Sequence, residues 1–254
     1  MATKVAPKKP AARAAASHVL YLYGITRTGG HAVLSSAGID GLAPVEPISC
    51  AGFTCWTSRV DRVEFADRLA ENMENLDWLA AASLRHQQAV SELARAGTVL
   101  PARFGTVFLN AASLARDVQR RRSALLKAFR RVADADEWGL KIFAMSQATA
   151  QISATSGKDY LRQKAASLKA SEHVLDPEVK KFVADLKRIA VELAPGGTVS
   201  SGQAGLEWHG SVLIRRNRYP QLQRLIDQYA ERWQNRHRIE STGPWPPYSF
   251  VKNA

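Results

Sequence analysis

The sequence predicts an α+β fold with two domains. In the first half, strand-like runs rich in β-branched and aromatic residues alternate with segments of helical periodicity. In the second half the predicted elements follow the order β-α-β-β-α-β, which is the ferredoxin-like pattern. Between the halves, the run Asp134-Ala135-Asp136-Glu137 interrupts the periodicity. We therefore expect a small sheet packed with helices over residues 18–133 and a ferredoxin-like domain over residues 134–254.

The first domain is expected to begin with two strands and a possible short strand between them, over residues 32–39. The first is His18–Thr26, which is rich in β-branched and aromatic residues and is followed by the turn residues Gly29-Gly30. The second runs from about Ile48 to Arg59. Cys50 and Cys55 lie in that strand, and residues five apart on one strand point to opposite faces. We therefore expect no disulfide between them.

Helices make up the rest of the first domain. Helical patterning begins near Asp61, and Asp77 has the character of an N-cap for a second helix, which ends at Gly97. The segment 99–108 is extended, because a proline and a glycine break it. A third helix is predicted from Ala111 to Val132, with apolar residues at helical spacing on its inward face.

The second domain begins with a strand over residues 137–145. A helical region then covers residues 156–193, and the pair Asp176-Pro177 marks a break in it, with the aspartate as N-cap and the proline in the first helical position. The remaining elements are predicted, in order, as a short strand over 198–202, a strand over 206–216, a helix over 219–233 and a strand over 236–242.

No arrangement of residues typical of catalysis or cofactor binding stands out. The phosphate-binding loop, the dinucleotide-binding glycine motif and the HExxH zinc motif are missing from the sequence. Its six histidines are scattered without metal-ligand spacing, and His86 is interpreted as a surface or packing residue on a helix. The sequence therefore predicts no enzyme, no cofactor and no metal site.

The chain is strongly basic, with a formal net charge of +12, which is typical of proteins with an acidic partner. The cations fall into three clusters, at residues 4–13, 116–131 and 215–238, and this distribution favours a generally basic surface. Arg120, Arg121 and Arg122 are the candidate partner-binding residues among them. Residues 1–17 are predicted to be a disordered arm, because they contain little to bury.

No membrane-spanning run or signal peptide is predicted. The longest apolar stretches fall short of the ~18 residues that a membrane span needs. The basic N-terminal arm is not followed by a continuous apolar block, as a signal peptide requires. We therefore expect a cytoplasmic protein with no membrane partner.

The stretch GPWPPYSF near the C-terminus combines three prolines with Trp245, Tyr248 and Phe250. Prolines hold an extended path at low entropic cost, and each aromatic side chain contributes a few kcal/mol when it is buried. Two interpretations follow. Either the stretch packs back on the protein and locks its end, or the aromatic side chains form a docking site for a partner.

A second distinctive stretch is VLPARFGTVF, which contains Arg103 and Phe104. Arg103 stands between apolar residues, where an unpaired buried charge would be costly. One interpretation is a structural salt bridge to an acid such as Glu240 or Asp77. The alternative is an arginine that faces a partner.

Together, these stretches resemble the GvpF/GvpL family of gas vesicle accessory proteins. The resemblance rests on five segments in order: YLYGIT, an alanine-rich helix containing His86, the Pro-x-Arg-Phe-Gly-Thr segment, SGKDYL and the terminal GPWPPYSF. It extends from about His18 to Val251 and leaves out the basic arm. The family's fold also implies two α+β domains.

The resemblance implies an accessory protein that binds the small apolar shell protein of the gas vesicle, together with other accessory proteins, and assists nucleation or early assembly. A shell subunit itself is excluded, because this chain is 23% charged and has a mean hydropathy of −0.23. Two other classes stay open. A basic nucleic-acid-binding module would explain the net charge, although nucleic acid is the less favoured partner, and an enzyme would need a pocket with convergent titratable groups.

Overall fold

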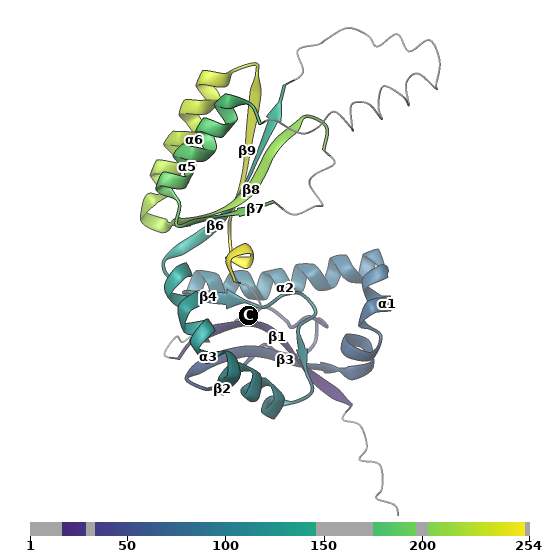
Figure 1. The fold of residues 1–254 in the computed structure, drawn as a ribbon. Helices are drawn as coiled ribbons and strands as arrows, with labels where there is room; N and C mark the ends of the chain where they lie inside the picture. Colours follow the sequence, from purple (N-terminus) through teal and green to yellow (C-terminus); the bar gives the residue numbers. More distant parts are fainter. Residues whose placement is uncertain (1–16, 29–33, 146–174, 197–202, 252–254) are drawn as a thin grey trace, which may run out of the picture.

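The computed structural model describes residues 17–28, 34–145, 175–196 and 203–251 (Figure 1). Within them, the chain forms two antiparallel sheets, each covered by helices. The predicted basic arm lies outside the described residues, apart from Ser17, and so does the strand predicted at 198–202.

The first sheet has the strand order β2-β3-β1-β4, and β5 also pairs with β1. Its strands are β1 (His18–Arg27), β2 (Glu46–Cys50), β3 (Phe53–Asp61), β4 (Val99–Pro101) and β5 (Val107–Phe108). Both faces of β1 are buried, with Tyr21 and Tyr23 on one side and Leu22 and Ile25 on the other. Gly24 lies so close to β4 that a Cβ would come within 3.0 Å of the Leu100 carbonyl oxygen.

The prediction of one strand from Ile48 to Arg59 is wrong, because this segment is a hairpin. Ala51 and Gly52 have φ values of 50° and 84°, and they turn the chain so that Cys50 pairs with Phe53. Cys50 and Cys55 consequently share one apolar cluster instead of pointing to opposite faces. Both thiols are free, and burial raises the pKa of each.

Helices cover both faces of the first sheet, which gives three layers (Figure 1). The helices are η1 (Val63–Asp67), α1 (Leu69–Glu74), α2 (Leu76–Ala96) and α3 (Ala111–Val132). On one face α2 packs Val90 and Leu93 against the side that carries Tyr21, and on the other α3 packs Leu114 and Phe129 against the side that carries Leu22. The two helices therefore lie on opposite sides of this half.

The start of α2 differs from the prediction. The side chain of Asn75, not that of Asp77, caps the helix, because its Oδ1 accepts the backbone N–H groups of Asp77 and Trp78, each at 3.1 Å. The C-terminal end at Gly97 is as predicted.

The second sheet has the strand order β7-β8-β6-β9. Its strands are β6 (Ala135–Ala144), β7 (Glu192–Pro195), β8 (Leu206–Arg215) and β9 (His237–Trp245). The helices α5 (Pro177–Ile189) and α6 (Tyr219–Trp233) cover one face, where Phe182, Tyr229 and Trp233 pack against Leu140 and Val212. Asp176 caps α5 as predicted, because its side chain accepts the N–H of Glu178.

The helix predicted to continue to residue 193 ends earlier. Ala190 is extended, with φ −73° and ψ 150°, and residues 192–195 pair with β8 as strand β7. Among the described residues, the elements of the second half therefore follow the order β6-α5-β7-β8-α6-β9. The short helices η3 (Arg216–Arg218) and η4 (Tyr248–Phe250) complete the described elements.

The apolar core is continuous across the two halves. Ala135 and Leu213 of the second sheet belong to the cluster under α3, and so do Phe250 and Val251 from the end of the chain. Helix η4 lies between the second sheet and the first half (Figure 1). The domain boundary near Asp134 stays a prediction, but the last residues of the chain pack into the core of the first half.

Candidate functional site

The centre of the candidate site is His86, a buried residue of α2. Its Nδ1 lies 2.9 Å from the hydroxyl of Tyr21 on β1, and its Nε2 lies 3.2 Å from the hydroxyl of Tyr248 in η4. The imidazole therefore links β1, the first strand, to η4 near the end of the chain. Of the two roles expected for His86, surface or packing, the packing role is confirmed, because the side chain is buried.

The three distinctive sequence stretches meet at this histidine. The Tyr21 hydroxyl also accepts the backbone N–H of Gly105 at 3.1 Å. The ring of Phe104 packs edge-on against both Tyr21 and His86, with centroid distances of 6.4 and 5.8 Å. YLYGIT, VLPARFGTVF and GPWPPYSF thus each contribute aromatic rings to a single cluster, in which Tyr23 of the first stretch also stacks on His86 at a centroid distance of 5.9 Å.

Burial sets the ionisation of this cluster. It lowers the pKa of His86 to about 4 and raises the pKa values of Tyr21 and Tyr248. At neutral pH the imidazole is consequently uncharged and both hydroxyls keep their protons. A general acid or base works best with a pKa near the working pH, so this arrangement suits holding the chain end more than transferring protons.

Glu137 forms a second anchor for the chain end. Its carboxylate is buried and accepts the backbone N–H of Ser249 at 2.8 Å and the hydroxyl of Ser249 at 2.5 Å. Arg131 of α3 donates to the carbonyl oxygen of Phe250. We call the anchors His86, Glu137 and Arg131, with the residues 248–250 that they hold, the tail clamp. Sequence reasoning missed Glu137, which showed only as an acid at the start of a strand.

The terminal stretch divides into a packed part and an exposed part. Pro246, Pro247 and Phe250 are buried, so this part packs back on the protein as the first interpretation states. Trp245 is 45% exposed, and its indole Nε1 donates to the Thr242 hydroxyl at 3.3 Å. Its side chain lines an open cleft of about 370 Å³ between the end of α2 and the second sheet.

The predicted salt bridge of Arg103 is wrong. Arg103 is exposed, and among the described residues neither Asp77 nor Glu240 pairs with it; Glu240 pairs with Arg238 instead. The physical reason is the turn that Arg103 begins, in which its carbonyl oxygen accepts the N–H and the hydroxyl of Thr106. The side chain points to solvent, where its charge needs no protein partner.

The three adjacent arginines of α3 do not form one patch. Arg120 is exposed, Arg121 is half-buried, and both pair with Asp117. Arg122 points to the hairpin turn, where its Nε donates to the carbonyl oxygen of Ala51 at 3.3 Å. Successive residues of a helix are about 100° apart around its axis, which separates these side chains.

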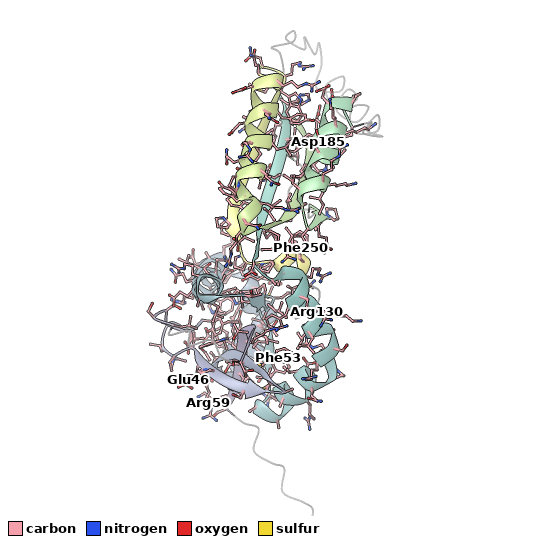
Figure 2. The ribbon with its side chains drawn as sticks, turned by 90° about the vertical axis from the view of Figure 1, so that its left-hand side faces the viewer. Glu46, Phe53, Arg59, Arg130, Asp185 and Phe250 are labelled. Carbon is pink, nitrogen blue, oxygen red and sulfur yellow. The ribbon has the colours of Figure 1, made fainter. Side chains whose placement is uncertain are left out.

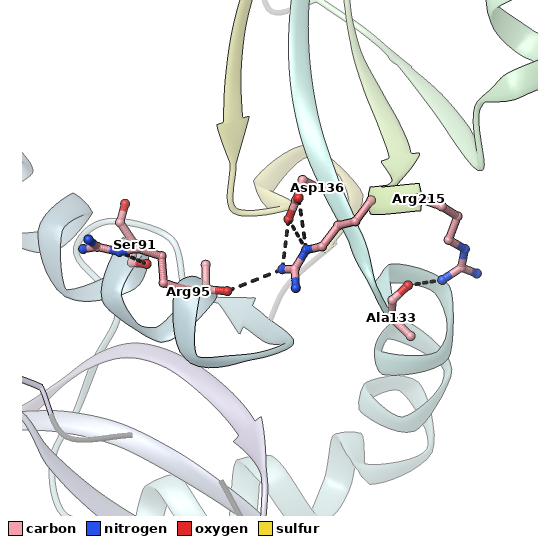
Figure 3. A network of polar contacts seen from close by, with 7 residues as sticks. Ser91, Arg95, Ala133, Asp136 and Arg215 are labelled. Carbon is pink, nitrogen blue, oxygen red and sulfur yellow. Dashed lines mark hydrogen bonds and ion pairs between the residues drawn. The ribbon is translucent and has the colours of Figure 1, made fainter. Parts of the chain in front are cut away.

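Arginines at the end of β8 and in η3 donate to carbonyl groups near the C-terminal ends of helices. Arg215 donates to the carbonyl oxygen of Ala133 after α3, and Arg218 donates to that of Ile189 in α5 at 3.4 Å. Arg216 donates to Ala94 in α2 at 3.4 Å and pairs with Asp136 at 3.0 Å (Figure 3). Cations favour helix C-termini, where carbonyl groups lack partners, so these contacts tie the second sheet to α2 and α3.

Exposed apolar side chains come from η1, α1 and the first half of α2, and α1 contacts both of the other helices. Leu76 and Leu84 are 77% and 60% exposed, and Met73 of α1 and Val63 of η1 are also exposed. Arg85 donates to the carbonyl oxygen of Ile39, which brings the loop with exposed Leu42 to the same helix. We call this group, Leu42, Val63, Met73, Leu76 and Leu84, the apolar patch.

None of the helices among the described residues is long and apolar enough to cross a membrane. Nor do these parts of the chain bring together three or more histidine, cysteine, aspartate or glutamate side chains in a way that could hold a metal ion.

Known proteins of one family match this chain over most of its length. The family model described as gas vesicle synthesis protein GvpL/GvpF matches residues 19–252. Gas vesicle protein L of Streptomyces sp. (strain CB03234) is 28% identical over 251 residues, which cover 91% of this chain and 92% of that protein.

Two crystal structures share the fold. The gas vesicle protein GvpF from Anabaena sp. PCC7120 aligns with a TM-score of 0.67 and 20% identity over 94% of this chain and 98% of its own. GvpF from Microcystis aeruginosa aligns with a TM-score of 0.64 and 19% identity over 92% of this chain and 99% of its own.

Proposed function

Because this chain belongs to the GvpL/GvpF family and so has a role in gas vesicles, we propose that it is an accessory protein that binds the small apolar shell protein and assists nucleation or early assembly. It does so in the cytoplasm, alongside other accessory proteins and without catalysing a reaction. We also assign residues 134–254 to the ferredoxin-like fold. The strand order β7-β8-β6-β9 supports that assignment.

The observation that carries the proposal is the apolar patch. A protein that will line a gas space must expose apolar surface before assembly, and such surface aggregates unless another protein covers it. The patch offers aliphatic side chains and a methionine, which adapts its shape to a partner surface. The leucines Leu76 and Leu84 lie two turns apart on one face of α2 and so suit an apolar helix laid along it.

The surface near the apolar patch also carries positively charged side chains. Arg62 directly precedes η1, Arg68 lies between η1 and α1, and Arg85 belongs to α2, so all three are close in sequence to the apolar side chains. The first two pair with the acids Asp67 and Glu71. Charge steers association and is screened by salt, whereas apolar contact is not. We therefore expect association with the shell protein to slow in high salt, with a modest loss of affinity.

The test is co-purification with the shell protein after co-expression. The variant Leu76→Glu/Leu84→Glu places two charges in the apolar patch, and Leu109→Glu makes the same change at an exposed leucine before α3. We expect the double variant to retain less than about a tenth of the shell protein, since two desolvated carboxylates oppose binding. The Leu109→Glu variant should retain it.

Thermal unfolding of both variants checks that they fold, because all three leucines are exposed. Equal retention by the double variant and the unchanged protein would overturn the proposal, as would an equal loss with Leu109→Glu.

A further inference from the structure

The outward face of α3 carries a regular row of cations. The inward face of this helix is apolar, with Leu114, Val118, Leu125 and Phe129 buried. On the opposite side, exposed cations recur at intervals of four, seven and three residues: Arg116, Arg120, Lys127 and Arg130. We call these four the cation row. It spans about 21 Å along the helix, at 1.5 Å per residue.

The protein itself leaves most of this charge uncompensated. Helix α3 contains six arginines and one lysine against a single acid, Asp117, which pairs with Arg120 and Arg121. Among the described residues, Arg116, Lys127 and Arg130 take part in no ion pair. Arg215, Arg216 and Arg218 hold helix ends, whereas these three cations of the row stand on one exposed helix face with no acid of the described residues paired to them.

We propose that the cation row binds an acidic helix of a partner protein. Its spacing of alternating three- and four-residue steps, with Ser123 in the missing position, matches the repeat at which two packed helices meet. Small exposed side chains lie along the row, Ala112 one turn before Arg116 and Ser123 and Ala124 between Arg120 and Lys127, and they allow a second helix to approach closely. A partner helix with carboxylates at the same spacing places one acid opposite each cation.

A helix fits this surface better than a nucleic acid does. The cations form a single file, not a broad groove, and the exposed large aromatic side chains of the described residues, Tyr219 and Trp245, lie elsewhere. Single-stranded nucleic acids need aromatic rings on which their bases stack. A duplex needs cations spread over both of its phosphate strands.

The cation row and the apolar patch occupy opposite sides of the first half. Helix α3 covers one face of the first sheet and α2 covers the other (Figure 1), and Arg130 marks the row in the rotated view (Figure 2). Both surfaces are therefore open to partners at the same time. The inference about α3 does not rest on the proposed binding of the shell protein, because a different helix and a different chemistry carry it.

The experiment uses fluorescence anisotropy with three labelled probes. One is a helical peptide with glutamates at alternating three- and four-residue spacing, and the second has the same composition in shuffled order. The third is a DNA duplex of similar length. Binding is measured at about 50 mM and about 300 mM salt, where screening weakens charge-driven association. We expect the spaced peptide to bind the full chain about tenfold more tightly than the shuffled one, with a strong loss at high salt.

Matched variants locate the site. Arg116→Glu/Lys127→Glu/Arg130→Glu reverses the three charges of the row that have no ion pair, and Lys180→Glu/Lys181→Glu/Lys187→Glu makes the same change in net charge at exposed positions of α5. The first variant should lose at least about tenfold in affinity and the second less than about threefold, because only the first removes the contacts. If the first variant does not fold, its glutamine counterpart replaces it.

Three results would overturn the inference. Equal affinity of the spaced and shuffled peptides would mean that spacing does not matter. Equal losses in the two variants would mean that net charge alone is sensed. Tighter binding of the duplex than of the spaced peptide would make the row a nucleic-acid surface. Variants of Leu76 and Leu84 should bind the spaced peptide normally, which separates this inference from the proposed function.

Discussion

At the scale of single residues, the central feature is the contact between His86 and the end of the chain. Sequence patterning could assign His86 to a helix interior, because its neighbours have helical spacing. It could not identify Tyr248 as the partner, since 162 residues separate the two and no local pattern encodes such a distance. The salt bridge predicted for Arg103 was wrong for a related reason. The turn that directs its side chain to solvent depends on a hydrogen bond from the Thr106 hydroxyl to the Arg103 carbonyl oxygen.

The burial of neutral His86 makes stability depend on pH. Its pKa of about 4 in the folded protein lies below the ordinary value of 6.5, so between these values the unfolded chain binds a proton that the folded chain does not. The contribution is complete above pH 6.5 and falls as the pH drops toward 4. Between pH 7 and pH 5 we expect a loss on the order of 2 kcal/mol from this residue. Urea unfolding at both pH values should show a smaller decrease for His86→Gln than for the unchanged protein.

Trp245 and Phe250 should differ in what they contribute to stability. Phe250 is 1% exposed in the core of the first half, so Phe250→Ala should lower the free energy of unfolding by about 3–5 kcal/mol. Trp245 is nearly half-exposed, and Trp245→Ala should cost less than about 1 kcal/mol. Chemical denaturation of the two variants measures both. A larger loss from Trp245→Ala than from Phe250→Ala would contradict the packing of the chain end described above.

At the scale of secondary structure, long periodic helices were the most predictable elements. Helix α3 has the predicted bounds, Ala111–Val132, because its apolar residues recur at helical spacing over six turns. The errors in the predicted elements concern a short turn and a short strand. The hairpin at Ala51-Gly52 lacks a strong turn pair, and strand β7 follows α5 so closely that its apolar residues continued the helical pattern.

The N-cap of α2 provides a direct test at this scale. Asn75→Ala removes the side-chain oxygen that accepts two backbone N–H groups, and we expect it to lower the free energy of unfolding by about 1 kcal/mol. Asp77→Ala removes only a favourable charge in the first turn, which is worth about 0.3–1 kcal/mol. Thermal unfolding of the two variants compares them. A clearly larger effect of Asp77→Ala would mean that the aspartate is the cap after all.

At the scale of the whole molecule, the end of the chain couples the two halves. The order of elements in the second half could be predicted from sequence, but the destination of the last residues could not. Their apolar character only indicates that they are buried, and the surface that covers them belongs to α3 and β1. The tail clamp and the arginines at the helix ends join the halves through separate contacts.

Removing the chain from Tyr248 onward should therefore destabilise the first half, although every deleted residue belongs to the second half in sequence. The loss should exceed about 4 kcal/mol, because the deletion exposes the pocket of Phe250 and leaves Glu137 without its partner. Hydrogen exchange of amides in α3 and β1 measures the effect. Unchanged protection of these elements would show that the first half folds without the end of the chain.

The most direct test of the account as a whole is hydrogen exchange of the full chain with and without the shell protein, which a soluble carrier keeps dispersed. Binding through the apolar patch should slow exchange in residues 63–84, the segment that contains η1, α1 and the first half of α2. The carrier alone should have no effect. Slowed exchange confined to β6–β9, with residues 63–84 unchanged, would contradict the proposed binding of the shell protein by this surface.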